Sequence, residues 1–185
     1  MNGQLWWYVT RASGLVAWAL LGLSTAMGLL LSARRTVGRR PSWYVDLHRG
    51  LSGLGCLFVA AHLSAILADS FEQFGPLDLI VPMRSSLSPG AVAWGIVALY
   101  LLVAVEATSL AVRRLPYQAW RRVHYASLAI FWLATLHALL AGTDATNRAL
   151  LAAGAASIVG CALLTFRRFT TSRDRREPIP VSPLN

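Results

Sequence analysis

Five apolar stretches, each close to twenty residues long, constrain this chain more than any other feature of its sequence. They are Ala12–Leu31, Gly50–Ala68, Gly90–Val112, Val123–Thr143 and Ala149–Phe166. A helix needs about 20 apolar residues to cross the hydrocarbon of a bilayer, and 56% hydrophobic against 14% charged residues is too apolar for a soluble domain. We therefore predict an all-α integral membrane bundle of five transmembrane helices.

The positions of the arginines predict how these helices cross the membrane. All seventeen basic residues are Arg, and most lie after the first stretch, after the third stretch or around the tail. The two other connections contain Asp69, Glu72, Asp78 and Asp144 against only Arg84 and Arg148. Because basic connections stay in the cytoplasm, we expect the N-terminus outside and the C-terminus in the cytoplasm of a multi-pass cell-membrane protein. The arginines flank apolar spans, so lipid rather than nucleic acid is the expected partner.

The chain is expected to form one membrane domain, residues 1–168, followed by a disordered cytoplasmic tail, residues 169–185, that is basic and contains proline. The first stretch has no basic region in front of it, so we interpret it as a retained helix and not as a signal peptide. Cys56 and Cys161 both lie within spans, where neither a disulfide nor a CxxC metal site is indicated. No internal repeat stands out.

All four histidines of the chain belong to the second and fourth spans. These are His48 and His62 in the second and His124 and His137 in the fourth. Ionisable residues inside a bilayer are rare and usually functional. A single membrane histidine is best explained as a packing residue, but four in two similarly spaced pairs are not. The histidines are therefore the candidate functional residues.

Depth in the membrane predicts which histidines act together. Both histidine-bearing helices run from the cytoplasm outwards, so His48 and His124 lie near the inner end, with the other two near the outer end. At about 1.5 Å per residue, separations of fourteen and thirteen residues correspond to about 21 and 20 Å. Two facing imidazoles at each depth can ligate a metal from both sides. An iron macrocycle suits such a gap. Zinc would usually bind four ligands, with carboxylates or thiolates among them.

The helical phase of the two pairs differs. Fourteen residues at 100° each return to within about 40° of the starting face, and the second helix carries Gly55 at the middle of that face, with Ser52 and Gly53 nearby. Thirteen residues rotate by about 220°, which would place His124 and His137 on different faces of an ideal helix. Either the fourth helix is locally distorted or the pairing fails.

The segments HRGLSGLGCLFVAAH and HYASLAIFWLATLH resemble the paired-histidine helices of the ferric reductase-like transmembrane family. That family includes the membrane parts of ferric reductases and NADPH oxidases and the haem subunits of bacterial methionine sulfoxide reductase systems, and it has the same fourteen-and-thirteen spacing. The resemblance covers roughly Tyr8–Phe166. It implies two b-type haems, an inner one with His48 and His124 as axial ligands of the iron and an outer one with His62 and His137.

Arg11 resembles the arginine that the family places near the outer haem. Charge points to the same role, because an arginine just below the outer interface needs an anion and a haem propionate would provide one. The alternative is that Arg11 reaches up to the lipid headgroups.

The chain departs from oxidases and eukaryotic ferric reductases after the last span, where no flavin or nicotinamide domain is expected, and it has no GxGxxG phosphate loop. We therefore expect the electron-transfer subunit of an oxidoreductase, with a separate cytoplasmic flavoprotein or quinol as donor. Flavin or quinone would then act through a partner. The acceptor would be ferric iron, oxygen, or an extracytoplasmic reductase or flavin-binding partner.

Two other functional classes remain open at this point. One is a haem-free membrane anchor or assembly subunit, which the four histidines argue against. The other is a haem or metal transporter, which would be expected to have broken helices and a more polar lining along the transport path. The roles of Phe131 and Trp132 between the haem depths, of Glu106 within the third span and of the long outer connection Ser70–Pro89 stay open as well.

Overall fold

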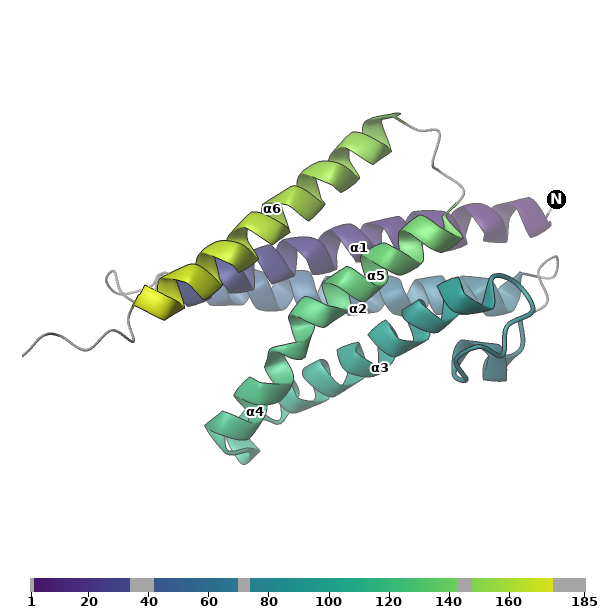
Figure 1. Cartoon of the computed structure of the whole chain (residues 1–185). Helices are drawn as coiled ribbons and strands as arrows, with labels where there is room; N and C mark the ends of the chain where they lie inside the picture. The colour runs from purple at the N-terminus through teal and green to yellow at the C-terminus, as the bar shows by residue number, and fades with distance from the viewer. Residues whose placement is uncertain (1, 34–41, 70–73, 143–147, 175–185) are drawn as a thin grey trace, which may run out of the picture.

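The computed structural model describes residues 2–33, 42–69, 74–142 and 148–174, and this part of the chain is a bundle of helices (Figure 1). Within these ranges there is no strand. The elements in chain order are α1 (Asn2–Ala33), α2 (Ser42–Ala68), the short 3-10 helix η2 (Pro76–Leu79), α3 (Pro89–Leu110), the 3-10 turn η3 (Val112–Arg114), α4 (Tyr117–His124), α5 (Ala126–Ala141) and α6 (Arg148–Asp174).

Four segments are long and apolar enough to cross a membrane, where the sequence predicted five. They are residues 4–32, 42–68, 89–110 and 117–141, the last combining α4 and α5. The fifth predicted span lies in α6, whose apolar part, Leu151–Arg167, is shorter than the other four. Helix α6 continues through residues 169–174, which the sequence assigned to the tail, and residues 175–185 lie outside the described part.

Helices α1 and α2 pack as an antiparallel hairpin along a seam that repeats every seven residues. A seven-residue repeat keeps the same face of each helix against its partner. At the middle of the seam, a Cβ added to Gly55 would lie 2.8 Å from Cδ2 of Leu21, so only glycine allows this approach. The pairs along the seam are Gly14 with His62, Leu21 with Gly55, and Gly28 with His48.

Helix α3 packs against α4 and α5 as a second hairpin, and α1 joins the two hairpins (Figure 1). The indole Nε1 of Trp18 on α1 donates a hydrogen bond of 2.9 Å to the hydroxyl of Thr135 on α5. The ring of Phe131 lies 3.0 Å from where a Cβ of Gly22 would be. Helix α6 lies against the other side of α1, where Gly154 approaches the Trp18 ring. The buried core at the centre comprises Leu21, Leu102, Val105 and Ile130.

The fourth predicted span is not one continuous helix. Helix α4 ends at His124 and α5 begins at Ala126, with a turn at Tyr125 between them (Figure 1). After the turn, the N–H of Leu128 donates to the carbonyl of Tyr125, three residues earlier, at 3.3 Å. This turn is tighter than an α-helical one. The structure therefore contains the distortion that a thirteen-residue separation of His124 and His137 requires.

Candidate functional site

The four histidines come together in two pairs, at the two depths that the sequence indicated. The ring centroids of His48 on α2 and His124 on α4 are 6.1 Å apart, with an interplanar angle of 76°. Those of His62 on α2 and His137 on α5 are 6.5 Å apart, with an angle of 78°. Each pair thus combines one histidine from each hairpin, and the two rings of a pair stand nearly perpendicular.

Three of the imidazoles are oriented by a backbone carbonyl of the neighbouring helix. Nδ1 of His48 lies 2.9 Å from the carbonyl oxygen of Ser24, with the Ser24 hydroxyl at 3.1 Å. Nδ1 of His62 lies 2.8 Å from the carbonyl of Thr10. Nδ1 of His137 lies 2.8 Å from the carbonyl of Ala91.

These carbonyl contacts determine which ring nitrogen is available for a metal. A carbonyl oxygen can only accept, so Nδ1 of each of these three rings carries the proton. In a neutral imidazole the lone pair then resides on Nε2. Fixing the ring and its tautomer through Nδ1 is the usual arrangement for a histidine that ligates a metal through its other nitrogen.

A glycine stands four residues after each of these carbonyls, and it makes room for the histidine ring. A Cβ added to Gly28 would lie 3.3 Å from Cε1 of His48, and one added to Gly14 would lie 3.0 Å from Nδ1 of His62. A Cβ added to Gly95 would lie 2.9 Å from Nδ1 of His137. Residue i+4 of an α-helix lies directly over the carbonyl of residue i. A side chain at that position would therefore push the ring away from its acceptor.

The fourth histidine, His124, has a serine in the equivalent place. The hydroxyl of Ser109 on α3 lies 3.4 Å from Nδ1 of His124. The indole of Trp120 stacks on the His124 ring, with centroids 4.8 Å apart and planes 27° apart, and its Nε1 donates to the same hydroxyl at 3.3 Å. Ser109 and Trp120 together therefore position this ring.

The supporting residues follow a spacing that sequence reasoning missed. Gly14 and Gly28 on α1 are fourteen residues apart, as are Gly95 and Ser109 on α3. The two hairpins thus contribute the same parts in the same order, first a helix with two ring supports and then a helix with two histidines. This internal repeat is visible in the sequence only as matching separations among small residues and histidines.

The layer between the two histidine pairs is filled by packed side chains. Phe131 is only 2% exposed and stacks on Trp18 at 6.3 Å between centroids. Its contact with Gly22 fixes α5 against α1. These contacts give Phe131 a packing function, and the neighbouring Trp132 is 37% exposed.

Two further predicted residues lie close to the histidine pairs. Arg11 is half-buried, and its guanidinium lies 4.1 Å from the ring centroid of Trp7. It directly follows Thr10, whose carbonyl orients His62. Glu106 on α3 accepts a hydrogen bond from the hydroxyl of Ser52 on α2. This carboxylate, whose role the sequence left open, thus has a serine of the neighbouring helix as a partner.

Each histidine pair offers two protein ligands. Within the described ranges, no group of three or more His, Cys, Asp or Glu side chains is arranged to hold a metal ion. The pairs therefore suit a metal whose remaining ligands come with a cofactor.

Comparison with known proteins gives one match. A family model described as the ferric reductase-like transmembrane component matches residues 13–136. This range contains His48, His62 and His124 and ends one residue before His137. No curated protein and no solved structure matches the chain significantly.

Proposed function

The chain belongs to the ferric reductase-like transmembrane family, and we propose that it is a di-haem b-type cytochrome that passes electrons across the cell membrane. Membership of the family and four apolar helices make it a membrane protein with an electron-transfer role. In the proposal, His48 and His124 are the axial ligands of the inner haem, and His62 and His137 are those of the outer haem.

The distance between the paired rings is the observation that carries the proposal. A metal–imidazole bond is about 2 Å long and each ring centre lies about 1 Å behind its nitrogen, so two axial imidazoles have centroids about 6 Å apart. The observed separations are 6.1 and 6.5 Å. The separation recurs at both depths, as expected of two sites built for the same kind of metal group.

The protein groups around the rings fit the same chemistry. The carbonyls of Ser24, Thr10 and Ala91 hold Nδ1–H, which leaves Nε2 of each ring free to bind iron. When bound, haem supplies one-electron redox chemistry at each site. The chain itself binds, orients and shields the two groups.

Arg11 is proposed to bind a propionate of the outer haem. It lies on α1 beside Thr10 and therefore at the depth of His62. Its guanidinium stacks on Trp7, which restricts its orientation, and a guanidinium binds carboxylates strongly.

Under the positive-inside rule, the arginine-rich connections favour a cytoplasmic location for the end of the bundle that contains His48 and His124. Electrons would enter there from a flavoprotein or quinol. They would leave from the outer pair to ferric iron, oxygen or an extracytoplasmic reductase or flavin-binding partner. In this arrangement the chain is the electron-transfer subunit of an oxidoreductase.

Haem quantitation tests the proposal. Purified chain should contain about two non-covalent haems b per polypeptide, because it has two histidine pairs and no CxxCH attachment motif. Pyridine haemochrome spectra together with amino-acid analysis give the ratio. A ratio near zero from protein expressed with ample haem, in folded form, would contradict the proposal and favour a haem-free anchor.

A further inference from the structure

The connection between α2 and α3 has an apolar tip that is largely exposed in the described part of the chain. Its tip, defined as Ile80–Met83, has the sequence Ile-Val-Pro-Met. The side chains of Ile80, Val81 and Met83 are 51%, 43% and 65% exposed, and that of Leu77 just before the tip is 53% exposed. Water would be a poor environment for four such side chains on one loop.

A tyrosine of α3 fixes the depth of this tip. The hydroxyl of Tyr100 donates a hydrogen bond to the carbonyl oxygen of Ile80. Tyr100 is eleven residues after Pro89, so its Cα lies about 16 Å along α3, near the middle of a hydrocarbon core about 30 Å thick. Helical side chains point back towards the N-terminus, which leaves the hydroxyl about 10 Å below the start of the helix. Ile80 must lie at the same depth.

Three backbone N–H groups in and next to the tip are paired within the loop. The N–H groups of Ile80 and Val81 both donate to the carbonyl of Leu77, at 3.2 and 2.8 Å, and that of Arg84 donates to the carbonyl of Val81 at 3.3 Å. Pro82 has no N–H. Non-helical backbone is tolerated at membrane depth where protein buries it, and the tip lies beside α3, where the hydroxyl of Tyr100 pairs with the carbonyl of Ile80.

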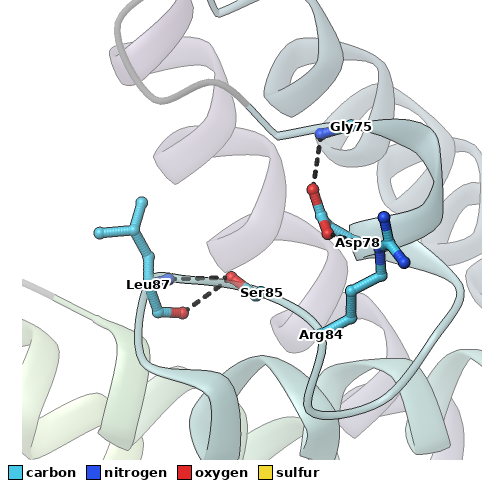
Figure 2. Close-up of polar contacts among 5 residues, drawn as sticks. All are labelled: Gly75, Asp78, Arg84, Ser85 and Leu87. Atoms are coloured by element: carbon cyan, nitrogen blue, oxygen red, sulfur yellow. Dashed lines mark hydrogen bonds and ion pairs between the residues drawn. The ribbon is translucent and has the colours of Figure 1, made fainter.

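Within residues 74–88, the polar side chains lie on either side of the tip. Figure 2 shows Asp78 accepting from the N–H of Gly75 at 2.9 Å and from Nε of Arg84 at 3.2 Å. The same figure shows the Ser85 hydroxyl donating to the carbonyl of Leu87 and accepting from its N–H. The ion pair neutralises two charges next to the apolar tip. Together these contacts fix the parts of the loop before and after the tip.

We propose that Ile80–Met83 is inserted into the hydrocarbon of the leaflet in which α3 begins, with lipid acyl chains as its partner and Tyr100 as its anchor. The connection is thus a re-entrant segment along the flank of α3. The inserted segment widens the cross-section of the protein within that leaflet, beside the first turns of α3. The inference does not depend on haem binding.

Depth-dependent fluorescence quenching in lipid nanodiscs tests the proposal on the full chain. Bimane is attached to Val81→Cys in a background in which Cys56 and Cys161 are replaced by alanine. Ser86→Cys, in the exposed base of the same loop, is the aqueous reference, and Val103→Cys, exposed in the middle of α3, is the deep reference. The label at 81 should be quenched by lipids carrying nitroxide on the acyl chain, as at 103. It should resist iodide, unlike the label at 86.

Two results would overturn the proposal. Quenching of the label at 81 by iodide to the level of Ser86 would place the tip in water. Protection from both iodide and lipid nitroxide would mean that protein, such as a second copy of the chain, covers the tip.

Two further variants extend the test, and the first of them does not need the cysteine-free background. Val81→Asp should lower the melting temperature of the protein in nanodiscs, because it moves a charge into hydrocarbon, while Ser86→Asp should leave it unchanged. Tyr100→Phe should raise the iodide quenching of the label at 81, since the anchor is lost. Equal melting temperatures for the two aspartate variants would contradict insertion, and unchanged quenching in Tyr100→Phe would exclude Tyr100 as the anchor.

Discussion

Replacing Gly95 by alanine should damage the outer haem site and leave the inner one intact. The added methyl group would lie 2.9 Å from Nδ1, 3.0 Å from Cε1 and 3.1 Å from Cγ of His137. Ordinary carbon contacts are about 3.5–4.0 Å, so the ring must move by about 0.5–1 Å. That shift also lengthens the 2.8 Å hydrogen bond from Nδ1 to the carbonyl of Ala91.

The size of the effect follows from two opposing contributions. Overpacking a well-filled site costs about 1–3 kcal/mol, whereas exchanging glycine for alanine within a helix returns about 1 kcal/mol. The net cost is up to about 2 kcal/mol, or about thirtyfold in occupancy of the outer site if the cost falls on haem binding. Redox titration followed by optical and EPR spectroscopy would resolve the two haems, and the outer signal should fall or shift.

Gly90→Ala on the same helix is the matched control, because nothing lies within 4 Å of its added Cβ. It should retain both haem signals and gain slightly in stability. If Gly95→Ala matched Gly90→Ala in haem content, spectrum and potential, the proposed support of His137 by this glycine would be refuted.

Three further substitutions test the remaining ring supports and the proposed propionate contact. Gly28→Ala should perturb the inner haem alone, because its Cβ would lie 3.3 Å from Cε1 of His48; an altered outer EPR signal would argue against this. Ser109→Ala should shift the inner potential or low-spin signal with little change in haem content, since it removes the 3.4 Å contact to Nδ1 of His124, and an unchanged titration would show that the hydroxyl does not position that ring. Arg11→Ala should change the outer midpoint potential more than the inner one, and equal shifts in both would indicate a lipid anchor.

The membrane fold could be predicted from the sequence because the apolar stretches follow directly from the thickness of the bilayer. Four predicted spans correspond to helices of sufficient length. The fifth corresponds to α6. That helix runs from Arg148 to Asp174, but its apolar part, Leu151–Arg167, is shorter than the other four spans. The end of α6 could not be placed either, because the basic residues after Phe166 are compatible with both helix and tail.

The juxtaposition of the histidines could also be predicted, but the reason why it is possible could not. Ideal geometry placed His124 and His137 on different faces, and the turn at Tyr125 changes the phase between them. Nothing in the local sequence around Tyr125 indicates a break, since neither glycine nor proline is present there. Helices α4 and α5 both pack against α3, and sequence periodicity does not describe such contacts.

The ring supports and the loop tip were missed for a related reason. Gly14, Gly28 and Gly95 resemble ordinary small residues at helix contacts, and only the coincidence of their separations with those of the histidines distinguishes them. The depth of Ile80–Met83 depends on a hydrogen bond from Tyr100, twenty residues further along the chain. Such a contact becomes visible only when the helices are placed together.

Single and double histidine replacements test the central claim most directly, with haem content and resolved haem spectra as the measurement. His48→Leu and His124→Leu should each remove or convert the same inner haem, and the double variant should resemble either single one, with about one haem left per chain. His62→Leu and His137→Leu should do the same to the outer haem. If His48→Leu instead resembled His137→Leu and spared the signal that depends on His124, the paired di-haem arrangement would be wrong.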